Sequence, residues 1–323
     1  MLYGILVTIR SEEDTAYVTQ RAAMLVAELK DATLDIFAVG APSCARRALS
    51  WMRGPKQHSE RAEQERKMRR LSCQSEYLRQ HYGVRCTIAS GAVALATQVA
   101  ARPETTAAGM VVLGRNGPEW AKLQPEASEV ARIAVMSACP VLVVRNEPRA
   151  AYSRIAVPVD FSDIALRVTE TVMWLLPEAH ITFLHSYRVA GQGTMLSLGM
   201  SDQAIDNCRL QAQRQAQGAF SAFLERLGRP LTKFSLVLTA QSEEVTARAY
   251  IHTIKPDLIV LANSSTTQMS QWLADSTAST VLRDTDCDVL LLQSAQAARS
   301  PSAGDGPVLP PAHREQSTVS GAS

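Results

Sequence analysis

Two glycines and a serine in the first half of the chain have the spacing of a phosphate-binding loop. Gly114 and Gly117 follow an apolar segment, and after nine further residues Ala127 and Ser128 open an expected helix. Glycine lets backbone amides approach a phosphate closely, and a helix start offers free N–H groups and a positive dipole end. The loop would comprise Gly114, Arg115, Asn116, Gly117, Ala127 and Ser128. The plainer interpretation is a surface turn before a capped helix, which fits any Gly-x-x-Gly considered alone.

A parallel sheet would position this loop, because strands alternate with helices along the chain. Apolar segments recur in the same order about 150 residues apart, such as Ile5–Ile9 with Ile155–Val159. The other expected strands are Leu34–Val39, Val84–Ile88, Met110–Leu113 and Val141–Val144, repeated as Ile181–Leu184, Phe234–Leu238, Leu258–Leu261 and Val289–Leu292. A near-constant offset across five strands indicates a duplicated α/β domain.

Helices are expected after the first and second strands of each half. Apolar residues at helical spacing mark the helices that follow the first strands: Val18, Ala22, Leu25, Val26 and Leu29, then Ile164, Val168, Val172 and Leu175. Long polar helices are expected at about 60–81 and 202–227. The charged run Glu60–Arg70 is interpreted as a solvated helix face rather than a nucleic-acid site.

The repeat divides the chain into a first domain at residues 1–147 and a second at 152–293. The segment Arg145–Ser153 is interpreted as a linker. Residues 294–323 are rich in Pro, Gly and Ser and have few large apolar side chains. Such a segment buries too little surface to offset its ordering entropy, so a disordered tail is expected.

The composition is that of a globular protein in a reducing compartment. Of 323 residues, 46% are hydrophobic and 20% charged, and the net charge is +2. No apolar run approaches the ~20 residues of a membrane span, and no secretory signal is recognised. The six cysteines form no C-x-x-C pair or metal-ligand pattern. We therefore expect a cytoplasmic protein that has reduced thiols and no metal site, and that binds neither membrane nor nucleic acid.

The loop spacing, the repeat and the ending Cys139–Val144 resemble the universal stress protein family. The resemblance covers both halves, from Leu2 to about Gln293, although Ala127 replaces the final glycine of the family's loop. It implies two tandem Rossmann-like domains of the adenine-nucleotide α-hydrolase-like type. Each would have a five-stranded parallel sheet with helices on both faces. Many family members bind ATP, with Mg²⁺ as its counter-ion, and others bind no nucleotide.

The resemblance also implies nucleoside contacts, which the two halves share unequally. Family members that bind ATP have an acidic residue after the first strand and a hydrophobic adenine contact at the end of the second. The first half has Arg10 and Val39 at these positions, and the second half has Asp160. In the second half the loop is degenerate, with Ala262, Ser265 and Asp275 in place of glycines and only Ser276 retained. Because Asp275 would repel phosphate, any nucleotide is expected in the first half.

These residues bear on three functional classes: a binding module, a hydrolase or nucleotidyl transferase, and an oxidoreductase. A nucleotide-binding or nucleotide-sensing stress module is favoured, and a protein–protein scaffold of the same fold is the alternative. A hydrolase or nucleotidyl transferase would need catalytic residues such as a His-x-Gly-His motif, which neither Ile9–Glu12 nor Val159–Ser162 provides. An oxidoreductase would need Gly-x-Gly-x-x-Gly. No enzyme is therefore expected, with weak ATP hydrolysis left open.

Other conspicuous residues are interpreted as structural. His185 lies near a strand end without a recognisable nucleophile or carboxylate beside it, and Cys139 and Cys287 are expected to be buried. The resemblance also implies pairing of the last strands, because the fifth strands of family members commonly pair in a dimer. In this chain Val141–Val144 and Val289–Leu292 are therefore expected to pair with each other as an internal pseudo-dimer, which also removes an exposed sheet edge. Whether the chain also forms a homodimer, and with which protein partner it acts, stays open.

Overall fold

A computed structural model of the chain provides the fold. It describes residues 4–9, 12–29, 32–39, 57–91, 109–114, 133, 139–187, 189, 195, 197–228, 233–240, 249–251, 253–263 and 285–293. The first half contains β1 (Gly4–Ile9), α1 (Glu12–Glu28), β2 (Thr33–Val39), α3 (Gln57–Tyr82), β3 (Cys86–Gly91), β4 (Met110–Gly114) and β5 (Val141–Val144). The second contains β6 (Arg154–Pro158), α7 (Asp163–Leu175), β7 (His180–Ser186), α9 (Asp202–Leu227), β8 (Phe234–Thr239), β9 (Leu258–Asn263) and β10 (Asp288–Gln293).

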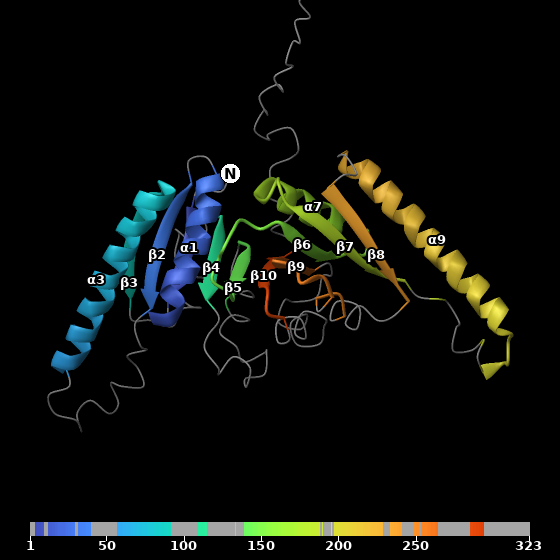
Figure 1. Cartoon of the computed structure of the whole chain (residues 1–323), viewed down its shortest axis with the longest axis horizontal. Helices are drawn as coiled ribbons and strands as arrows, with labels where there is room; N and C mark the ends of the chain where they lie inside the picture. The colour runs from blue at the N-terminus through green and yellow to red at the C-terminus, as the bar shows by residue number, and fades with distance from the viewer. Residues whose placement is uncertain are drawn as a thin grey trace, which may run out of the picture.

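All these strands belong to one continuous sheet, in the order β3-β2-β1-β4-β5-β10-β9-β6-β7-β8. The first half occupies one side of the molecule and the second half the other (Figure 1). Neighbouring strands within each half are parallel, and the two five-stranded sheets meet where β5 and β10 pair antiparallel. This result confirms the expected tandem α/β architecture and the expected pairing of the two last strands.

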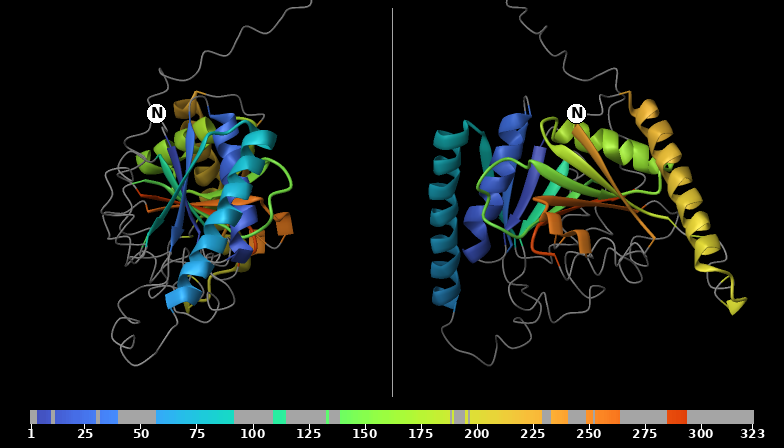
Figure 2. Two further views of the ribbon diagram at one scale, coloured as in Figure 1. Left: turned by 90° about the vertical axis from the view of Figure 1, so that its left-hand side faces the viewer. Right: turned by 45° about the vertical axis from the view of Figure 1, so that its right-hand side comes forward.

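The long helices α1, α3, α7 and α9 all pack against the same face of the sheet (Figures 1 and 2). Side chains alternate between the faces of a strand, so β1 directs Ile5, Val7 and Ile9 into the core that these helices cover. The opposite face carries a second core, to which Ile133, Tyr250 and Ile251 contribute from segments outside the sheet. Burial on both faces explains why the central strands are almost wholly apolar.

The helix boundaries follow from local capping chemistry. Ser162 caps α7 by accepting a hydrogen bond from Ala165 N at 3.2 Å, and Ser201 caps α9 in the same way. At its other end α9 stops at Gly228, whose φ of 60° is in the left-handed region that favours glycine. The helix expected at 202–227 has these same bounds, and α3 is longer than expected by a few residues.

A few sequence expectations are corrected in detail. The strand expected at Ile155–Val159 ends at Pro158, and β3 begins at Cys86, so the buried Val84 precedes it. Cys139 is buried as expected, but Cys287 is only partly buried. The segment interpreted as a linker does connect β5 to β6, yet its residues Arg145 and Tyr152 are buried. The expected tail at 294–323 lies outside the described residues.

Candidate functional site

Each half of the sheet contains one point where the chain order reverses. In the first half β1 and β4 are neighbours; β1 continues toward β2 and β3 on one side, whereas β4 continues to β5 on the other. In the second half β6 and β9 have the same relation. Ligands of open parallel sheets bind beyond the carboxyl ends of strands at such switch points. The first-half switch point is therefore bounded by Ile9 and Gly114, the last residues of β1 and β4.

The structure places three of the sequence-predicted site residues. Gly114 is the buried last residue of β4, Val39 is the last residue of β2, and Asp160 follows β6. Val39 and Gly114 end strands that lie on either side of β1. The other predicted positions lie outside the described residues: Arg10, Arg115, Asn116, Gly117, Ala127, Ser128, Ser265 and Ser276.

Sequence reasoning missed Thr8 at this switch point. Its side chain is 3% exposed, and its hydroxyl has no hydrogen-bond partner within the described part of the chain. Thr8 stands opposite Leu113 of β4 on one side and Phe37 of β2 on the other. Threonine is common in β-strands, so the sequence alone gives no sign that this one is unusual. A buried hydroxyl without a partner is unfavourable and marks a place where a polar group would be accepted.

In the second half, Asp160 takes part in the turn that starts α7. Its Oδ1 accepts a hydrogen bond from Ser162 N at 3.0 Å, and the carboxylate is exposed. Phe161 has a φ of 60°, which is unusual for a residue with a bulky side chain. Its ring packs against His185 at 4.3 Å between centroids. The His185 Nδ1 is 2.8 Å from the carbonyl oxygen of Val159, a contact that suits the structural role expected from the sequence.

A second carboxylate, Asp257, joins the start of β6 to the segment before β9. It accepts hydrogen bonds from Ser153 N at 3.1 Å, Ser153 Oγ at 2.7 Å and Arg154 N at 3.0 Å, and it pairs with Arg154 Nη2 at 3.1 Å. Burial by itself raises the pKa of Asp257, but these hydrogen bonds outweigh it, so the pKa lies below the ordinary 3.8.

Asp257→Asn should make the stability of the second half less sensitive to acid. The folded pKa of Asp257 is lowered, so its ionisation stabilises the fold above the ordinary value of 3.8. This contribution is lost as the pH falls through the lower folded pKa. Urea midpoints measured from about pH 6 down to about pH 3 should fall less steeply for the variant. Leu198→Ala, which truncates a 75% exposed side chain and removes no ionisable group, is the control and should keep the wild-type slope.

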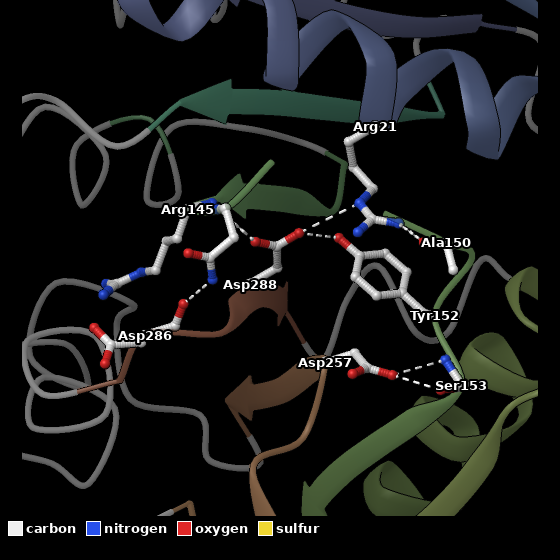
Figure 3. Close-up of polar contacts among 9 residues, drawn as sticks. Arg21, Arg145, Ala150, Tyr152, Ser153, Asp257, Asp286 and Asp288 are labelled. Carbon is white, nitrogen blue, oxygen red and sulfur yellow. Dashed lines mark hydrogen bonds and ion pairs between the residues drawn. The ribbon is translucent and has the colours of Figure 1, made fainter. Parts of the chain in front are cut away.

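A third carboxylate, Asp288, is buried where the two halves meet (Figure 3). Its Oδ1 accepts a hydrogen bond from Arg145 N at 2.8 Å, and its Oδ2 accepts one from Tyr152 Oη at 2.5 Å. Arg21 of α1 forms an ion pair with Oδ2, with its Nε at 3.4 Å. The Arg21 guanidinium also lies 4.0 Å from the centre of the Tyr152 ring and donates to the carbonyl oxygen of Ala150 at 2.8 Å.

These contacts make the cluster of Arg21, Arg145, Tyr152 and Asp288 a closed polar centre in an apolar surrounding. Burial raises the pKa of Asp288, and the Tyr152 hydroxyl and the Arg145 amide act in the opposite direction. Burial, together with the charge of Asp288, raises the pKa of Tyr152 well above its ordinary value. Because these contacts run between α1, the end of β5, the segment 145–152 and β10, the cluster joins the two halves.

The described residues offer little for metal or thiol chemistry. Among them, no three His, Cys, Asp or Glu side chains gather in the way that a metal ion requires. Burial raises the pKa of Cys287 to about 11, with only a partial opposing effect of the Thr285 hydroxyl, so this thiol stays protonated near neutral pH. No helix in the described ranges is long and apolar enough to cross a membrane.

Comparison with known proteins relates both halves to one fold. Residues 151–293 match the model of the universal stress protein family. A putative universal stress protein from Pseudomonas aeruginosa has a TM-score of 0.57 and 14% identity, with 92% of this chain and 95% of that chain covered. A universal stress protein from Archaeoglobus fulgidus has a TM-score of 0.56 and 12% identity, with coverages of 89% and 96%. At these identities the structural likeness shows the fold alone. No curated protein matches the chain in sequence.

Proposed function

Because residues 151–293 form a universal stress protein domain and the first half repeats its fold, we propose that this chain is a tandem nucleotide-binding module. It acts by binding or sensing an adenine nucleotide in a stress response, rather than by turnover. Two features argue against turnover. His185 contacts the Val159 carbonyl oxygen and packs against the Phe161 ring. Asp160 accepts the Ser162 amide in the turn before α7.

The first-half switch point is the proposed nucleotide site. The observation that carries this proposal is the adjacency of β1 and β4, which puts the glycine that ends β4 beside the carboxyl end of β1. Residues 115–117 and 127–128 follow in sequence and supply the glycine and serine of the phosphate loop. The unpartnered hydroxyl of the buried Thr8 provides a polar group at the same place. ATP therefore fits the residues present, with its phosphates held by backbone amides and Mg²⁺ as its counter-ion.

The second half is proposed to contribute structure more than ligand binding. Its acidic residue Asp160 is present, but one carboxylate oxygen already accepts the Ser162 amide. Asp275 stands where the loop of a nucleotide-binding domain would need a small uncharged residue. A negative charge there opposes a triphosphate.

Gly117→Val should abolish nucleotide binding, because a branched side chain would enter the path along which the backbone amides meet the phosphates. Asp160→Ala is the matched control in the other half and should leave binding unchanged. Calorimetry with ATP, ADP and adenosine measures both variants against wild type. We expect modest affinity that depends on phosphate more than on the base, since Arg10 replaces the acidic nucleoside contact.

The opposite pattern, with binding lost in Asp160→Ala and kept in Gly117→Val, would move the site to the second half. No binding by the folded wild-type chain would instead favour the scaffold function, in which the Gly114 loop is a turn inherited with the fold. Circular dichroism of each variant shows whether a lost signal reflects lost binding or lost structure.

A further inference from the structure

The apolar side chains where β5 meets β10 do not by themselves distinguish one partner from another. The residues of the two paired segments are all buried and nearly identical in type, with the sequence VLVV at Val141–Val144 and VLLL at Val289–Leu292. Leu142 stands opposite Leu290 at the centre of the pair. Because these two leucines occupy equivalent positions in the repeat, β5 could be paired with β5 of a second chain in the same register.

The Asp288 cluster breaks this symmetry. Every hydrogen bond and ion pair described for the Asp288 carboxylate comes from the other side of the β5–β10 pair or from the connecting segment: Arg145 N, Asn146 N at 3.4 Å, Tyr152 Oη and Arg21. Two more contacts cross at the same end, from the Arg145 guanidinium to the Thr285 carbonyl and from the Asn146 side-chain amide to the Asp286 carbonyl. The contacts to the Asp288 carboxylate require β10, not a second β5, beside β5, whereas the two backbone carbonyls would be present in either pairing.

The equivalent position in the first half has no carboxylate. The sequence Cys139-Pro140-Val141 corresponds to Cys287-Asp288-Val289, so Pro140 stands where Asp288 stands in the repeat. A cluster of this kind can therefore form at one end of the β5–β10 pair and not at the other. The acceptor lies on β10, and its donors lie on the first half and the connecting segment.

We propose that the Asp288 cluster is a pairing selector, which makes the β5 edge of the first half accept the second half and reject a second copy of itself. In a β5–β5 pair, Arg21, Tyr152 and the Arg145 amide would be buried opposite Pro140 without their acceptor. In a β10–β10 pair, two Asp288 carboxylates would be buried without the Tyr152 hydroxyl and without the counter-charge of Arg21. Burying such groups unpaired is costly, whereas the β5–β10 pair satisfies them all.

Transferring the carboxylate should redirect the pairing. The variant Pro140→Asp/Asp288→Pro moves the acceptor to β5, where a second copy of the first half can supply its donors. Proline is tolerated as the first residue of a strand. A cysteine at position 142, introduced by Leu142→Cys in the full-length chain, detects a β5–β5 pair. Two copies of residue 142 face each other only in that pair, where they can form an interchain disulfide. We expect the yield of the interchain 142–142 disulfide, identified by peptide mapping, to rise about tenfold or more over the Leu142→Cys parent.

A second variant distinguishes an effect on the choice of strand partner from a loss of folding stability. Arg21→Leu/Asp288→Leu removes both buried charges, and apolar replacement of a buried ion pair is often well tolerated. We expect this protein to stay folded by circular dichroism and yet to give a raised 142–142 yield. Asp257→Asn, which removes a hydrogen-bonded carboxylate held within the second half, is the control and should give the parent's yield. Parental yield in the two test variants, or an equal rise in the control, would overturn the proposal.

Discussion

Arg21→Met should lower the free energy of unfolding by about 3–5 kcal/mol, because it leaves a buried carboxylate without its counter-charge. The side chains of Arg21 and Asp288 are only 9% and 3% exposed, so water cannot replace the lost partner. The substitution also removes the guanidinium from the Tyr152 ring and from the carbonyl of Ala150. Methionine keeps the unbranched apolar stem, so little of the loss arises from packing.

Urea unfolding followed by circular dichroism measures this effect. Arg154→Met is the matched control, because Arg154 also pairs with an aspartate but its side chain is 55% exposed. Ion pairs at the surface contribute about 0–1 kcal/mol, so the control should unfold close to wild type. A loss below about 1 kcal/mol for Arg21→Met would show that the cluster tolerates an uncompensated Asp288.

Phe183→Ala should cost about 3–5 kcal/mol, since it empties the aromatic core of the second half. Phe183 of β7 is fully buried, and its ring lies 5.6 Å from each of the rings of Phe220, Phe223 and Phe234. These contacts join β7, β8 and α9, so the cavity would open between a strand pair and its covering helix. Well-packed surroundings relax only partly into such a space.

The same unfolding experiment tests this change, with Leu198→Ala as the control. Leu198 is 75% exposed, and its truncation should alter the free energy of unfolding by no more than about 0.5 kcal/mol. If Phe183→Ala behaved like Leu198→Ala, the aromatic cluster would not be the core that its burial indicates.

The arrangement of strands could be predicted from the sequence because it rests on local and repeated patterns. Strands buried on both faces appear as short apolar runs, and the repeat places each run twice. Pairing of the last strands was expected from the family resemblance, and the need of an exposed edge for a partner supported it. Helix 202–227 was predicted as a long polar segment, and the structure shows that Ser201 and Gly228 cap it at those ends.

The Asp288 cluster could not be predicted, because its members are far apart in the sequence. Tyr152 and Arg145 are 136 and 143 positions from Asp288, and Arg21 is farther still. An aspartate just before an apolar run indicates a turn, and a proline-containing segment such as 145–153 indicates a linker. Only the three-dimensional fold shows that this linker is anchored between the halves.

For the candidate site, the sequence predicts which residue types are present. The structure adds the position, burial and hydrogen bonds of those residues that it describes. Gly114 ends β4 beside β1, as the switch-point argument requires, and Thr8 adds a buried hydroxyl that pattern analysis passed over. Asp160 is present but engaged with Ser162, a contact that its position in the motif does not reveal. The contributions of Arg10 and Gly117 stay predictions, which the binding experiments test.

The twist of the continuous sheet determines how the carboxyl ends of the strands at the two switch points are oriented relative to each other. The antiparallel join of β5 and β10 sets the strands of the halves in opposite directions, but four strand-to-strand steps separate the β1–β4 pair from the β9–β6 pair. At about 20–25° a step, the accumulated rotation is about 80–100°. The two carboxyl edges therefore meet at a corner instead of facing apart, and the arrowheads of β2 and β8 both lie in the lower part of Figure 1.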